Sequence, residues 1–238
     1  MRNINTIFRR EVAGFFNSPM AYIFLVIFAI VNGYFFTNTF FLFGQSDLRV
    51  LFDIVPLVYL FFIPAVSMGL IAREHNLGTM EIISTLPINN FEFVLGKFFA
   101  ALSLILLGLF ATSIHFFTLI FVGSNVDYGA IFSGYLGLAL MGGTYAAIGT
   151  YSSSVTENQV VSFIIGVFIV LVLFMLDKRL VFIPNSIAGF IQFLSVDYHL
   201  SNISRGVIDS RNLIYFISMI GFFIFLTIQT LEVKRSKL

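Results

Sequence analysis

The sequence predicts an all-α, polytopic membrane protein with about six transmembrane helices in a single domain over residues 1–238. Three observations predict this fold class. Apolar residues make up 58% of the chain and charged residues only 11%, whereas about a quarter of a typical soluble domain is charged. The mean hydropathy is +0.98, and the apolar residues gather in segments of about 20 residues, the length that crosses a bilayer as a helix. Polar stretches rich in turn-forming residues separate these segments.

Six apolar segments have the length of a membrane span, and they lie at residues 20–43, 51–72, 97–122, 130–151, 160–176 and 212–231. An even number of spans places both termini on the same side of the membrane. The Lys234-Arg235-Ser236-Lys237 cluster directly follows the last span, and cytoplasmic loops carry an excess of Lys and Arg. We therefore expect both termini in the cytoplasm. The net charge of only +1 gives no indication of a nucleic-acid partner.

Residues 1–19 have the pattern of an amphipathic helix. Phe15 and Phe16 fall on or near its apolar face, whereas Arg9 and Arg10 lie elsewhere on the helix. This pattern predicts a helix that lies in the membrane interface before the first span. The alternative interpretation is a plain cytoplasmic extension of that span.

The loop at residues 73–96, between the second and third spans, predicts a short helix from about residue 80 to residue 86. Thr79 is a good N-cap, Glu81 lies in the first turn where the helix dipole favours an acid, and Pro87 ends the helix. The apolar side of this helix is formed by Ile82, Ile83 and Leu86.

The loop at residues 177–211, before the last span, is the longest and is only moderately polar. Backbone that enters the membrane must be helical or buried in protein, so we expect short extracytoplasmic helices near residues 186–195 and 198–205. Four ionisable side chains could form an ion-pair cluster there: Asp197, His199, Arg205 and Asp209. The loop is either a structured cap, or a gate or docking surface for a periplasmic partner.

The chain shows no recognisable catalytic or metal-binding motif. It contains no Cys, and His75 is followed by Asn76 where a zinc motif of the H-E-x-x-H type requires Glu. The Gly96-Lys97 pair lacks the first Gly and the Ser or Thr of an ATP-binding P-loop. We therefore expect no catalytic residue, metal site or cofactor in this chain, which would not be an enzyme. Any ATP and Mg would be bound by a separate ATPase subunit.

His115 is the clearest ionisable residue inside a span, where such residues are candidates for function. One interpretation is a neutral imidazole that is hydrogen-bonded to a neighbouring helix. The other is a functional group of an intramembrane enzyme, which the missing motifs disfavour. No carboxylate lies deep within a span, which argues against a proton-coupled secondary transporter.

Residues 73–88 read R-E-x-x-x-G-T-x-E-x-x-x-x-x-P-I, and Gly96-Lys97 follows at the start of the next span. This pattern resembles the permease subunits of ABC-2 type transporters. The segment at residues 197–216, which begins Asp-Tyr-His-Leu-Ser, narrows the resemblance to the GldF type, the gliding-motility-associated permeases of Bacteroidetes. Residues 15–22 are similar to the same group, and the likeness covers essentially the whole chain.

The resemblance implies that the helix in the 73–96 loop is a coupling helix, which docks in a groove of an ATPase subunit. Glu74, Glu81 and Glu92 are then the candidates for polar contacts with that ATPase. A second permease subunit, GldG-like or a second copy of this chain, would complete the complex in the bacterial inner membrane. The implied function is export or conformational work coupled to ATP hydrolysis, related to gliding motility. The alternative is a mechanotransmission subunit, which signals ATP hydrolysis to a periplasmic or secretion complex without moving a cargo.

Overall fold

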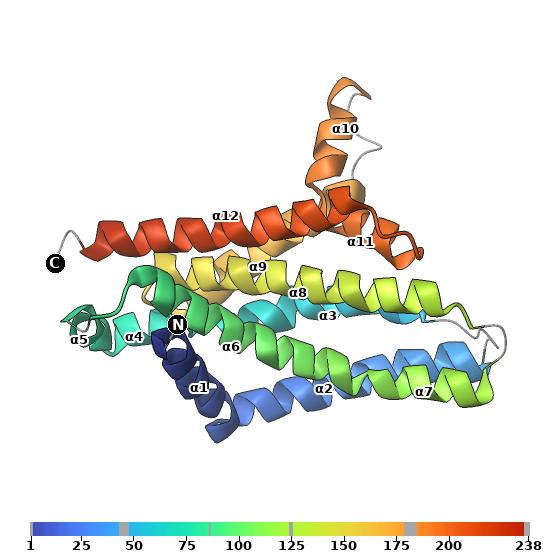
Figure 1. Cartoon of the computed structure of the whole chain (residues 1–238), viewed down its shortest axis with the longest axis horizontal. Helices are drawn as coiled ribbons and strands as arrows, with labels where there is room; N and C mark the ends of the chain where they lie inside the picture. Colours follow the sequence, from blue (N-terminus) through green and yellow to red (C-terminus); the bar gives the residue numbers. More distant parts are fainter. Residues whose placement is uncertain (1, 43–47, 86, 124–125, 179–184, 236–238) are drawn as a thin grey trace.

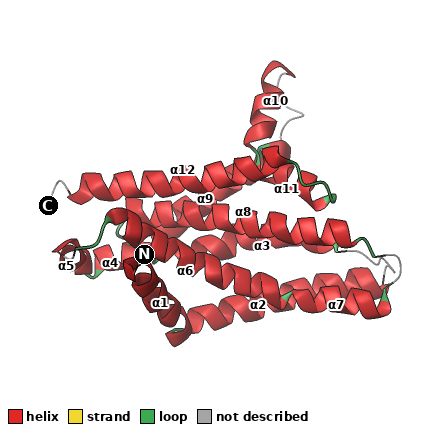
Figure 2. Cartoon of the chain, viewed as in Figure 1, coloured by secondary structure: helices red, strands yellow, loops and turns green. Residues whose placement is uncertain are grey.

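The structure is a computed structural model that describes residues 2–42, 48–85, 87–123, 126–178 and 185–235, all of which form helices or their connections without a strand (Figure 2). The elements are α1 (Arg2–Asn17), α2 (Pro19–Thr37), the π-helix η1 (Asn38–Leu42), α3 (Arg49–Ser67), α4 (Ala72–Asn76), α5 (Thr79–Thr85), α6 (Asn90–Ala111), α7 (Ser113–Val122), α8 (Tyr128–Val155), α9 (Gln159–Met175), α10 (Asn185–Leu194), α11 (Val196–Ser204) and α12 (Ser210–Arg235). The expected all-α class is confirmed for these residues.

The long helices run side by side and give the bundle two distinct ends (Figure 1). At the terminal end lie α1, α4, α5 and the last turns of α12, close to both chain termini. At the opposite end, which we call the α7–α8 end, lie the last turn of α7 and the first turn of α8. Functional residues can therefore be assigned to one end or the other.

Five helical segments of the described chain are long and apolar enough to cross a membrane: Pro19–Phe41, Arg49–Asn76, Asn90–Val122, Tyr128–Val155 and Ser210–Arg235. The fifth expected span, at residues 160–176, coincides with α9, which is apolar but has only 17 residues. Helices of about 20 residues are needed for a perpendicular crossing. The sides of the bundle expose large apolar residues such as Phe110, Phe121 and Phe168, a surface that suits contact with lipid.

The helix α8 is the centre of the bundle and packs against α3, α6, α9, α11 and α12. Two of its glycines allow this close packing. A Cβ atom at Gly149 would lie 1.7 Å from the hydroxyl oxygen of Ser67, and one at Gly134 would lie 2.2 Å from the ring of Phe52. Small residues at such positions let membrane helices approach each other closely.

The third span differs from the expected continuous helix at residues 97–122. It begins at Asn90, and α6 gives way to α7 at Thr112. The Thr112 hydroxyl donates to the carbonyl of Leu109 at 2.7 Å, and the Tyr135 hydroxyl donates to the carbonyl of Thr112 at 3.1 Å. These two bonds satisfy polar groups at the break, which would be costly to leave unpaired in lipid.

Candidate functional site

The terminal end contains a group of four charged side chains that come from three separate segments. Arg10 and Glu11 lie on α1, Glu74 on α4 and Lys97 on α6, and we call this group the ionic cluster. The Lys97 ammonium lies 2.9 Å from a carboxylate oxygen of Glu11 and 2.9 Å from one of Glu74. The Arg10 guanidinium donates to both of these carboxylates. Two positive and two negative charges are thereby balanced within the protein.

Burial makes the ionic cluster a constraint on the fold. Lys97 is only 1% exposed, and its ammonium also lies 4.9 Å from the centroid of the Phe93 ring. Burial opposes ionisation of Glu11, but the charge of Lys97 and the hydrogen bonds from Arg10 and Lys97 outweigh it, so that the pKa of this carboxyl is lowered. A buried charge is strongly unfavourable once its partner is removed. The ionic cluster therefore holds α1, α4 and α6 in one arrangement.

A second polar contact joins the same region to the last turn of α8. The Ser153 hydroxyl donates to the carbonyl of Met68 at 2.8 Å and accepts the backbone N–H groups of Ile71 and Ala72, both at 2.9 Å. Ser153 is fully buried. It thus satisfies backbone groups in the turn between α3 and α4, where no helical partner serves them.

The short helix α5 lies beyond these contacts and begins one residue earlier than expected. Gly78 has a φ of 67°, a left-handed conformation that glycine adopts readily. The chain can therefore turn sharply between α4 and α5. The expected N-cap does not form, because the Thr79 hydroxyl donates back to the carbonyl of Glu74 at 3.2 Å and Thr79 is itself the first helical residue.

Two faces of α5 have different environments. Met80 and Ile83 are partly buried and pack against the core, whereas Glu81 and Ile82 point outward, with Ile82 64% exposed. Ile82 and Ile83, which were expected on one apolar side of the helix, therefore lie on different faces. Consecutive helical residues are about 100° apart, so Ile83 faces the bundle while Ile82 faces away from it.

The remaining residues predicted for this region occupy several environments. Glu74 is part of the buried ionic cluster and Glu92 accepts a hydrogen bond from Asn3 at 2.9 Å, which leaves Glu81 as the exposed carboxylate among the three candidates. Pro87 is exposed after the helix, and Leu86 lies outside the described residues.

The amphipathic helix α1 packs on the start of α6, and its position in the membrane interface stays a prediction. Phe15 is buried, Phe16 is half-buried and Arg9 is exposed. Arg10, expected on the polar face, belongs to the ionic cluster. The helix therefore combines an apolar face against the bundle with a charged contact to α4.

Of the four ionisable residues expected to form a cluster in the loop at 177–211, His199, Arg205 and Asp209 line one pocket of about 410 Å³, whereas Asp197 does not. Asp197 pairs with Lys178 at 3.1 Å, and the Asp209 carboxylate accepts the N–H of Arg211 at 2.9 Å. Arg205 is exposed at this pocket. Lys178 and the local backbone thus provide partners for Asp197 and Asp209, and an ion-pair cluster of the four residues stays a prediction.

His199 instead forms a buried contact between α11 and α12. Its Nδ1 lies 2.7 Å from the side-chain oxygen of Asn212 and its Nε2 lies 2.8 Å from the carbonyl oxygen of Phe193. Its ring stacks on Tyr215 with the centroids 3.9 Å apart. Because both nitrogens are engaged, His199 positions the start of the last span.

His115 stacks on the ring of Phe36, with the centroids 4.5 Å apart. This aromatic contact joins α7 to α2 and differs from the expected hydrogen bond to a neighbouring helix. Within the described ranges, no three His, Cys, Asp or Glu side chains gather in a way that could hold a metal ion.

The residues that sequence reasoning missed are Glu11, Lys97 and Ser153. Lys97 was assigned to the cytoplasmic end of a span, and its burial depends on α1 folding over it. One feature of the sequence could have indicated the ionic cluster. Glu11 is the only acid on an otherwise apolar and basic amphipathic helix, and a lone acid in that position suggests a specific basic partner.

A comparison of the chain with models of known protein families finds no match. A comparison with curated proteins likewise finds no significant relative.

Proposed function

We propose that this chain is the membrane-spanning permease subunit of an ABC transporter complex. In this proposal a separate ATPase subunit binds ATP and Mg and docks on α5. ATP hydrolysis then drives export or conformational work across the bacterial inner membrane, with both termini in the cytoplasm. The sequence pattern at residues 73–88 and the likeness of residues 197–216 to GldF-type permeases support this assignment and a relation to gliding motility.

The observation that carries the proposal is the position of α5. This helix presents Glu81 and Ile82 outward at the terminal end while Met80 and Ile83 pack on the core. Beside it, α4 is tied to α1 and α6 by the ionic cluster. A force applied to α5 would therefore reach three parts of the bundle through buried, charge-balanced contacts, as transmission from an ATPase requires.

Docking on α5 is tested by co-purification of the chain with its ATPase. The double substitution Glu81→Arg with Ile82→Asp reverses one charge and removes an exposed apolar contact without touching the ionic cluster. We expect it to reduce the bound ATPase at least tenfold, because the few central residues that dominate an interface cost about 2 kcal/mol or more each when lost, and about 1.4 kcal/mol is a tenfold change in affinity.

The control for the charge reversal is Glu232→Arg, which repeats the change made by Glu81→Arg on an exposed residue near the end of α12. This variant should retain the ATPase. Equal binding by the α5 variant and the wild type would contradict the proposal, as would loss of binding in the control alone.

A mechanotransmission role is a second candidate, and the position of α10 favours it. This helix projects sideways from the bundle (Figure 1), and its Phe190 and Phe193 are 69% and 50% exposed. Such a helix could contact a partner protein beside the bundle. Stimulation of ATP hydrolysis by a transported molecule would favour transport, whereas stimulation only by a partner complex would favour mechanotransmission.

A further inference from the structure

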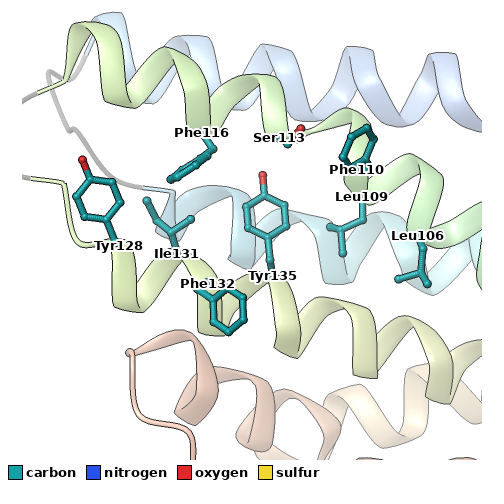
Figure 3. A pocket seen from close by; sticks show the side chains of 9 residues that line it. All are labelled: Leu106, Leu109, Phe110, Ser113, Phe116, Tyr128, Ile131, Phe132 and Tyr135. Atoms are coloured by element: carbon teal, nitrogen blue, oxygen red, sulfur yellow. The ribbon is translucent and has the colours of Figure 1, made fainter.

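A cavity of about 490 Å³ opens on the side of the bundle between α6, α7 and α8 (Figure 3). Its volume is within the range of about 300–1,000 Å³ that is usual for ligand sites. Figure 3 shows Phe116 of α7 pointing toward Ile131 of α8 across the gap. The residues that line the cavity are Leu106, Leu109, Phe110, Ser113, Phe116, Tyr128, Ile131, Phe132 and Tyr135.

The lining makes the cavity suitable for an apolar ligand. Six of these residues carry no polar side-chain atom. The Tyr135 hydroxyl is already used, because it donates to the carbonyl of Thr112 and lies 3.2 Å from the Thr112 hydroxyl. A ligand with buried polar groups would therefore find few partners, and unpaired polar groups are costly in such surroundings.

The length of the cavity matches one leaflet of a bilayer. From Leu106 to Phe116 the chain advances ten residues, or about 15 Å at the rise of an α-helix. The hydrocarbon core of a bilayer is about 30 Å thick. A chain that follows α6 and α7 along the cavity would thus cross about half of that core.

The mouth of the cavity indicates what occupies it. Phe110 and Phe132 are 74% and 69% exposed on the side of the apolar bundle, where the surrounding medium is lipid hydrocarbon. Tyr128 is the first residue of α8 and is 58% exposed. A tyrosine at the end of a span is typical of the headgroup level, so the cavity extends from that level toward the middle of the membrane.

From these features we infer that the cavity binds one acyl chain of a phospholipid from the leaflet at the α7–α8 end. The chain would lie between α6–α7 and α8, with its headgroup near Tyr128. This inference rests on the apolar surface of the bundle and is independent of the proposed transporter function.

The absence of Trp from the sequence provides a direct test. The substitution Phe116→Trp would introduce a single fluorophore into the cavity, which brominated phospholipids quench only on contact. Phe168→Trp, at a residue 67% exposed on α9, is the control in contact with bulk lipid, and Phe174→Trp, at a residue 2% exposed, is the buried control. We expect Phe116→Trp to be quenched to at least half the extent of Phe168→Trp. Quenching as weak as that of Phe174→Trp would overturn the inference.

A second experiment uses the native side chain at position 116 and measures retained lipid by native mass spectrometry. Leu106→Phe adds bulk inside the cavity, whereas Leu107→Phe adds the same bulk at a neighbouring position that is 42% exposed and outside the lining. We expect the wild type and Leu107→Phe to retain one phospholipid per chain, and Leu106→Phe to retain less than half as much. Equal retention by the two variants, or a retained mass that corresponds to detergent, would contradict phospholipid binding.

Discussion

The two ends of the bundle differ in the interactions between their helices, which are ionic at the terminal end and apolar at the α7–α8 end. At the terminal end, α1, α4 and α6 are joined by the ionic cluster, and Lys97 is almost completely buried within it. At the α7–α8 end, an apolar cavity opens on the side of the bundle, and five of its nine lining residues are aromatic, of which three are exposed. The first arrangement fixes the geometry of the helices, whereas the second leaves space between them.

This difference indicates where movement can begin and where it can be accommodated. Paired buried charges fit together in few geometries, because each displaced charge loses its partner in a medium of low dielectric constant. Apolar contacts are not directional and can be replaced by lipid. We therefore expect substitutions in the ionic cluster to have large effects on stability, and comparable substitutions at the opposite end to have small ones.

The largest effect is expected for Lys97→Met. This change leaves Glu11 and Glu74 with a single partner, Arg10, whose side chain is 55% exposed. Breaking a buried ion pair costs about 3–5 kcal/mol, and we expect a decrease of this size in the free energy of unfolding, measured by SDS titration in mixed micelles. A decrease below 1 kcal/mol would show that the ionic cluster does not constrain the fold.

An effect of intermediate size is expected for Ser153→Ala. This change removes the hydroxyl that serves the N–H groups of Ile71 and Ala72, and leaves buried backbone groups unpaired. The expected loss is about 1–3 kcal/mol. Ser103→Ala is the matched control, since the Ser103 hydroxyl only donates to the Ala100 carbonyl of its own helix, and it should be nearly neutral.

The acid stability of the terminal end should depend on Glu11. Its pKa is lowered in the folded protein, so it contributes stability at neutral pH. That contribution begins to be lost as the pH falls below the unfolded value of about 4.3, and is gone below the folded pKa. Glu11→Gln should be less stable than the wild type at pH 7, and the difference between their melting temperatures should shrink as the pH is lowered toward 4 and below. A difference in melting temperature that does not change with pH would exclude the Glu11 carboxylate as the source of the acid sensitivity.

The smallest effect is expected for Lys178→Met. The pair that Lys178 forms with Asp197 is also ionic, but the Lys178 side chain is 49% exposed. Exposed ion pairs contribute less than about 1 kcal/mol. Lys97→Met and Lys178→Met make the same residue change, the first in a buried ion pair and the second in an exposed one. Their free energies of unfolding should be measured under the same conditions. Similar losses of unfolding free energy in the two variants would show that burial does not make the Lys97 pairs more important for stability than the exposed Lys178 pair.

The sequence predicted the positions of the helices better than the contacts between them. Among the described residues, hydropathy located the five candidate spans and the shorter apolar helix α9, because each needs a long run of apolar residues wherever it packs. Turn residues also placed α5 within one residue of its start. These features depend on neighbours along the chain.

The ionic cluster could not be predicted in the same way. Lys97 pairs with Glu74 and Glu11, which are 23 and 86 residues away in the sequence. A single sequence contains no record of which distant charges meet. For the same reason the pairing of Asp197 with Lys178 is not evident from the sequence, and Glu74, expected at a docking surface, lies in the ionic cluster.

The most direct test of the account is photocrosslinking from α5 in living cells. A photoreactive amino acid at position 82 should form an adduct with a protein that carries the G-x-x-x-x-G-K-[ST] motif of an ATPase, and the same reagent at position 121, a residue 83% exposed at the α7–α8 end, should not. Mass spectrometry of the adduct identifies the partner. Crosslinks from position 82 that reach only lipid, or an ATPase adduct from position 121 alone, would contradict the claim that α5 is the docking site.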